Sequence, residues 1–120
     1  MIHTEKDFIE WLDGQLNEDL TSQVVAFNIN IYESPFSIEV VGSYEFDQDD
    51  DDWACNEDWV PKKRTTTVSG SIYGSSWNEA QDNILNMARS YLRSGSVNAH
   101  KLVAAKAFAV GFVDGNLSYV

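Results

Sequence analysis

"VVAFNINIYESPFSIEVVGSYEF", residues 24–46, decides the fold because its apolar residues alternate with a period of two. The first half of this stretch places four apolar residues on one face: Val25, Phe27, Ile29 and Ile31. After the turn residues "ESPF", the second half keeps five in phase: Phe36, Ile38, Val40, Tyr44 and Phe46. The two runs predict an antiparallel hairpin whose apolar face needs helices to cover it. Glu39 and Glu45 fall on the opposite face, which we expect to be exposed to solvent.

Segments with helical spacing flank this hairpin. Apolar residues three and four apart predict an amphipathic helix over about residues 4–19, with Thr4 as its N-cap. Ser76 and Glu79 form an S-x-x-E capping box, which opens a longer and more strongly patterned helix. Gly95 is placed to end that helix.

The remaining segments complete an α+β pattern. "RTTTVSGSIY", residues 64–73, predicts a third strand, and residues 98–106 predict a short helix or turn. "FAVGFVDGNLSYV", residues 108–120, predicts two strands joined by a type I′ turn at Asp114-Gly115. The order α-β-β-β-α-(α)-β-β predicts an antiparallel sheet of four to five strands with helices packed on one face. The length suits a single domain over residues 1–120.

The net charge of −11 is unevenly distributed along the chain. Residues 1–58 hold sixteen of the nineteen acidic residues and one of the eight basic residues. Such a surface repels nucleic acid and anionic membranes and attracts a basic protein. The start of the chain lacks the pattern of a signal peptide, no stretch is apolar enough for a membrane span, and Cys55 is the lone cysteine. These features predict a cytoplasmic protein.

Catalytic motifs are absent from the sequence. His3 and His100 are the only imidazoles, and neither stands beside a nucleophile motif or in a zinc-ligand spacing. A pair of catalytic carboxylates needs two environments that separate their pKa values, which a run of solvated aspartates does not offer. We therefore expect no enzymatic activity, no cofactor and no dedicated metal site.

"DQDDDDWACNED", residues 47–58, is the unusual segment, with seven carboxylates around Trp53 and with Trp59 directly after it. Charge runs are usually solvated loops, but tryptophan is the residue most enriched at interface hot spots. The carboxylates would steer and pair with a cationic partner, and one of the two indoles would be an apolar anchor. At least one indole is expected to fix the loop to the core instead. The predicted partner-binding residues are Asp47, Asp49, Asp50, Asp51, Asp52, Trp53, Glu57, Asp58 and Trp59.

Three other interpretations remain open, and one of them is a small hydrolase or isomerase with an unrecognised carboxylate site, which a deep pocket with buried, pKa-shifted acids would support. Asp47, Asp49 and Asp51 match the first three ligand positions of an EF-hand loop, which would suit a calcium- or cation-binding module. Asp52, however, replaces the glycine that this loop needs, and Asp58 replaces its bidentate glutamate. Alternatively, the last predicted strand leaves a sheet edge that could pair with a second copy in a homo-oligomer.

Three patterns carry a resemblance over about residues 44–120. They are "DDDWACNEDW" at residues 50–59, W-x-E-A at residues 77–80, and "VGFVDGNLSYV" at residues 110–120. Together they resemble small acidic bacterial proteins, some of which are immunity proteins of polymorphic or contact-dependent growth inhibition toxins. The resemblance implies a cytoplasmic antitoxin that binds one cognate toxin domain and has no catalysis of its own. A basic nuclease is the toxin that best suits the acidic charge, because its active site must hold a phosphate backbone.

Overall fold

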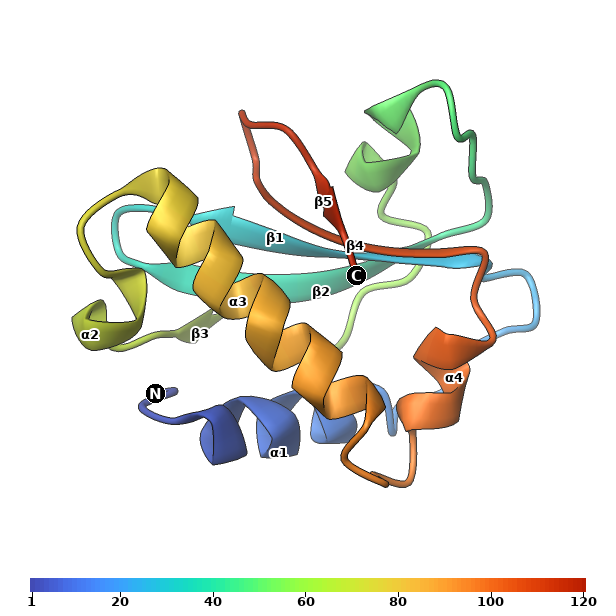
Figure 1. Ribbon diagram of the computed structural model, residues 1–120. Helices are drawn as coiled ribbons and strands as arrows, with labels where there is room; N and C mark the ends of the chain where they lie inside the picture. Colours follow the sequence, from blue (N-terminus) through green and yellow to red (C-terminus); the bar gives the residue numbers. More distant parts are fainter.

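A five-stranded mixed sheet divides the molecule into two sides (Figure 1). The computed structural model describes residues 1–120 and orders the strands β3-β2-β1-β4-β5. The α+β class and the number of strands are confirmed. The strands are β1 (Ala26–Tyr32), β2 (Ser37–Ser43), β3 (Thr66–Thr67), β4 (Ala107–Phe112) and β5 (Ser118–Tyr119).

The central strand pair corrects the expectation of a fully antiparallel sheet. β1 and β2 form the predicted antiparallel hairpin, with Ile29 opposite Val40. On its other side β1 pairs in parallel with β4, and Ala26 lies opposite Ala107. Parallel strands need a long crossover connection, and the helical segments between β2 and β4 provide it. Alternation along one strand cannot reveal the direction of its neighbour, so the sequence pattern did not distinguish the two arrangements.

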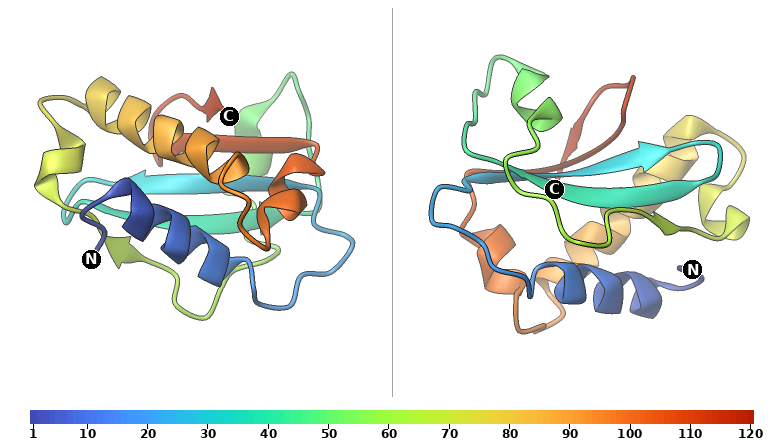
Figure 2. Two further views of the ribbon diagram at one scale, coloured as in Figure 1. Left: turned by 60° about the horizontal axis from the view of Figure 1, so that its bottom comes forward. Right: turned by 180° about the vertical axis from the view of Figure 1, so that it is seen from behind.

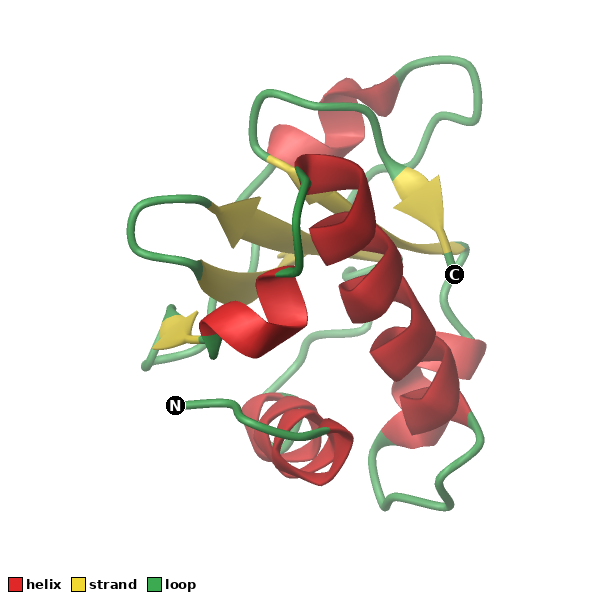
Figure 3. Ribbon diagram, turned by 60° about the vertical axis from the view of Figure 1, so that its left-hand side comes forward, coloured by secondary structure: helices red, strands yellow, loops and turns green.

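Helices cover one face of the sheet, as predicted (Figures 2 and 3). Thr4 Oγ1 accepts from the Asp7 N–H at 3.1 Å, and Ser76 Oγ accepts from the Glu79 N–H at 3.1 Å, so both predicted helix starts are confirmed. The first helix ends earlier than expected, soon after the poor helix former Gly14. The helices are α1 (Glu5–Gln15), α2 (Gly70–Tyr73), α3 (Trp77–Leu92) and α4 (Ala99–Val103).

Two predicted strand segments differ in detail. Within residues 64–73 only Thr66–Thr67 is a strand, because Ser69 Oγ accepts from the Ser71 N–H and starts the helical turn α2. The β4–β5 connection is not a type I′ turn, since that turn needs positive φ angles and neither residue 114 nor 115 has one. A longer loop joins the paired residues Val110 and Ser118 instead.

Both faces of the sheet are covered. The main core, between sheet and helices, includes the fully buried Phe8, Leu12, Ile29, Ile84 and Tyr91. On the opposite face lies a smaller cluster made of Ala26, Trp53, Ala54, Ala107 and Ala109. The expectation that Glu39 is exposed is therefore wrong: it is 1% exposed, whereas Glu45 is exposed as predicted. None of the helices combines the length and the apolar character needed to cross a membrane.

Candidate functional site

The acidic segment, residues 47–58, lies on the sheet face opposite the helices (Figures 1 and 2). It contains the short 3-10 helix η1 (Asp51–Cys55), which Asp50 caps by accepting from the Asp52 N–H at 2.9 Å. Asp47 makes the same kind of turn and accepts from the Asp49 N–H at 2.9 Å. Aspartate side chains favour such local turns, so part of the aspartate run has a conformational role.

Trp53 fixes the first half of the acidic segment to the sheet. Its side chain is 4% exposed and packs on the small alanines of β1 and β4, with Phe46 edge-on at a centroid distance of 5.5 Å. Its Nε1–H donates to the Tyr119 hydroxyl at 3.3 Å, and that hydroxyl donates to Asp51 Oδ1 at 3.1 Å. The indole thus connects the segment to the C-terminal strand β5, and in this conformation a partner cannot reach most of its ring.

The second half of the segment is held by other contacts. The half-buried Trp59 donates from Nε1 to the Asp19 carbonyl at 3.1 Å, and its backbone bridges to Gly42. Asp58 Oδ2 accepts from the Tyr44 N–H at 2.8 Å. Glu57 forms an ion pair with Arg64, at 2.9 Å from Nη2 to Oε2. Both indoles therefore anchor the segment inward, and the two acids nearest Trp59 are engaged within the protein.

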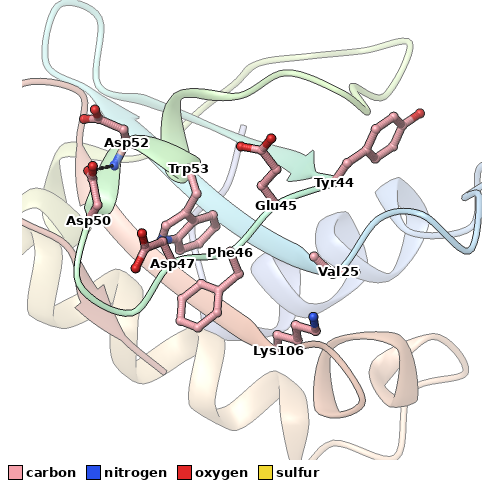
Figure 4. A pocket seen from close by; sticks show the side chains of 9 residues that line it. All are labelled: Val25, Tyr44, Glu45, Phe46, Asp47, Asp50, Asp52, Trp53 and Lys106. Carbon is pink, nitrogen blue, oxygen red and sulfur yellow. Dashed lines mark hydrogen bonds between the residues drawn. The ribbon is translucent and has the colours of Figure 1, made fainter.

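The five remaining predicted acids are exposed and take part in none of the four ion pairs of the protein: Asp47, Asp49, Asp50, Asp51 and Asp52. Three of them border an open pocket of about 460 Å³, where Lys106 is the only basic group (Figure 4). The pocket is lined by Val25, Tyr44, Glu45, Phe46, Asp47, Asp50, Asp52, Trp53 and Lys106. The segment thus combines a fixed backbone with unneutralised carboxylates.

The buried Glu39 is the centre of a polar network that the sequence pattern did not reveal. Its carboxylate accepts from Asn30 Nδ2 at 3.1 Å, from Arg64 Nε at 3.1 Å and from the Tyr32 hydroxyl. Burial, followed by the hydrogen bond to Glu39, raises the pKa of Tyr32 to about 12. Because Arg64 also contacts Glu57, it links the sheet to the acidic segment. The signal in the sequence was the polar face of the first strand, where Asn28, Asn30 and Tyr32 are in phase.

A second cleft, of about 410 Å³, lies between the acidic segment and the β4–β5 hairpin. The polar residues of β1 form its floor, and we call it the Asn28 cleft. Its two walls differ in character. One carries the carboxylates of Asp51, Asp52 and Glu57, and the other carries the apolar side chains of Val113 and Leu117. The ring of Phe112 points to the helix side of the sheet, where it stacks on Trp77.

The remaining predictions on binding stay predictions. No group of three or more His, Cys, Asp or Glu side chains converges so that it could hold a metal ion. The carboxylates proposed as EF-hand ligands are partly engaged with their own backbone, as Asp47 is with Asp49.

Comparison of the chain with protein-family models, with curated proteins and with solved structures found no significant match.

Proposed function

We propose that this protein is an immunity protein, which binds a basic toxin domain through its acidic segment and neutralises it by occupying its surface. The observation that carries the proposal is the set of five exposed, unpaired aspartates on a segment fixed at both ends. Such a cluster costs folding free energy by self-repulsion, and this cost is recovered when cations of a partner approach. The cluster would also accelerate association by electrostatic steering.

The fixed backbone favours a tight complex. Trp53 and Trp59 already hold the segment in place, so little conformational entropy is lost when a partner binds. A nuclease is the proposed target, because its active site presents Lys and Arg groups arranged for phosphates, and an array of carboxylates can take the place of those phosphates. Neutralisation by occupancy needs no catalytic group in the inhibitor. The proposed place of action is the cytoplasm, where such a toxin would meet nucleic acid.

A charge-matched pair of variants tests the proposal. The first carries Asp47→Asn, Asp49→Asn and Asp50→Asn, which remove three charges but keep the Oδ1 acceptors of the local turns. The control carries Glu5→Gln, Glu10→Gln and Asp82→Asn, which remove three exposed charges from the helical side. Wild type and both variants are used to capture partners from lysates of the source cells and their relatives at low and high salt.

The captured protein is then produced in cells, and growth is measured with and without each form of the inhibitor. We expect the partner alone to stop growth, and wild type and the control variant to restore it. The Asp47/Asp49/Asp50 variant should bind at least about 100-fold more weakly, with a flatter salt dependence, since close charge pairs across interfaces couple strongly. A captured protein without toxicity, or equal rescue by both variants, would refute the proposal.

A further inference from the structure

The hydrogen bonds beneath the Asn28 cleft run in one direction. Glu39 pairs with Arg64 and its carboxylate can only accept, so Asn30 must turn its amide nitrogen toward it. The carbonyl oxygen of Asn30 then accepts from Asn28 Nδ2 at 2.7 Å. This leaves Asn28 Oδ1 at the end of the chain of bonds. Rotating either amide by 180° would place two donors or two acceptors against each other.

Asn28 Oδ1 is a buried acceptor without a donor. Asn28 is 2% exposed, lines the floor of the cleft, and its Oδ1 is the only buried side-chain polar atom of the protein that lacks a hydrogen bond. An orphaned acceptor of this kind costs free energy and calls for a specific explanation. Because the direction of the network is set by Glu39, the explanation must be a group that donates.

The walls of the cleft narrow the choice of donor. Carboxylates on one side favour a positive charge, and apolar side chains on the other favour an aliphatic stem. A guanidinium on a three-carbon stem meets both conditions and offers several N–H donors in one plane.

We propose that the Asn28 cleft binds an arginine side chain of the partner protein, with Asn28 Oδ1 accepting from its guanidinium and Asp51 and Asp52 balancing its charge. The identity of the partner rests on the function proposed above, but the chemistry of the cleft can be tested alone.

The first test titrates the protein with N-acetyl-arginine-N-methylamide and, separately, with the citrulline analogue, which has nearly the same shape but no charge. The readout is the side-chain amide NMR signals of Asn28 and Asn30. We expect saturable shifts with the arginine probe at millimolar concentration and binding at least about tenfold weaker with citrulline. Equal binding of the two probes, shifts confined to Asp47–Asp50, or no saturable shift would overturn the proposal.

Two changes to the protein test whether the arginine probe binds in the Asn28 cleft. Asn28→Leu removes the acceptor at similar volume and should weaken arginine binding by about tenfold or more. Because a buried substitution can disturb folding, the second change is alkylation of the folded wild type at Cys55, the single cysteine, which is exposed and lines the cleft. N-ethylmaleimide at this position should abolish the shifts at Asn28. The Glu10→Gln, Asp82→Asn variant, changed on the helical side, should bind the probe as wild type does. Unchanged binding after alkylation would contradict the proposed location.

Neutralisation assays separate this inference from the proposed function. If alkylated protein inhibits the purified partner in vitro as well as unmodified protein does, the cleft is not part of the interface, although the immunity function stands. If no toxic partner is found but the arginine probe still binds at Asn28, the immunity function fails. In that case the guanidinium that binds at Asn28 would belong to a free cationic small molecule and not to a partner protein.

Discussion

Truncation of Trp53 is the most direct test of how the acidic segment is held. The side chain is 4% exposed, and burial of a tryptophan removes about 200 Å² from water, which at about 25 cal/mol/Å² corresponds to about 5 kcal/mol. The alanine in Trp53→Ala retains part of this area, and the segment can settle onto the alanines below it. We therefore expect a loss of about 3 kcal/mol in the free energy of unfolding, at the lower end of the range for such truncations.

Trp53→Phe is the matched control. It keeps the aromatic contact with Phe46 and loses the Nε1–H bond to Tyr119, so the expected loss is about 1 kcal/mol. Urea unfolding followed by far-UV circular dichroism measures both losses, and hydrogen exchange shows whether residues 47–58 open before the rest of the chain. If Trp53→Ala costs less than about 1 kcal/mol, or no more than the phenylalanine variant, Trp53 does not hold the segment and the reasoning on preorganisation fails.

Three further predictions concern the sheet, its pH response and its helix. Since the folded state raises the pKa of Tyr32 from 10.0 to about 12, this residue contributes stability below pH 10 that is lost as the pH rises toward 12. Unfolding free energies measured over that interval should fall more steeply in wild type than in Tyr32→Phe, and parallel slopes would contradict the assignment. Gly42→Ala should cost about 1–3 kcal/mol in urea unfolding, because its Cβ would lie 2.7 Å from Val24 Cγ1 and 3.2 Å from Trp59 Cβ; an unchanged midpoint would show that this contact is loose. Ser76→Ala should lower the unfolding free energy by about 1 kcal/mol through loss of the N-cap, while Ser76→Asp should restore it.

Local patterns predicted the elements that depend on neighbouring residues. The β1–β2 hairpin follows from alternation along one stretch, and the starts of α1 and α3 follow from caps within three residues of each other. The parallel β1–β4 pair did not follow, because alternation carries no information about strand direction. The expected third strand was interrupted by Ser69, whose hydroxyl offers the backbone a turn in place of a ladder.

The candidate site was predictable in part. The acidic run was visible in the sequence, but the burial of Trp53 depends on alanines in β1 and β4 that lie far from it in the chain. Glu39 was assigned to an exposed face because alternation identifies the second face of a strand without showing whether anything covers it. The unpaired Oδ1 of Asn28 could not be predicted either, because the direction of its hydrogen-bond network depends on the buried Glu39, which bonds to Asn30.

The parallel pairing of β1 with β4 also affects when, during synthesis, the acidic segment gains its contacts with the sheet. Residues paired across these strands are about eighty positions apart, so a growing chain exposes one edge of β1 for ~4–16 s of synthesis before its partner emerges. Trp53 packs on alanines of that late strand, and its indole donates to Tyr119, which emerges later still. The first half of the acidic segment therefore lacks the contacts of Trp53 with β4 and β5 until this delay has passed, whereas the second half can already contact Asp19 and Gly42.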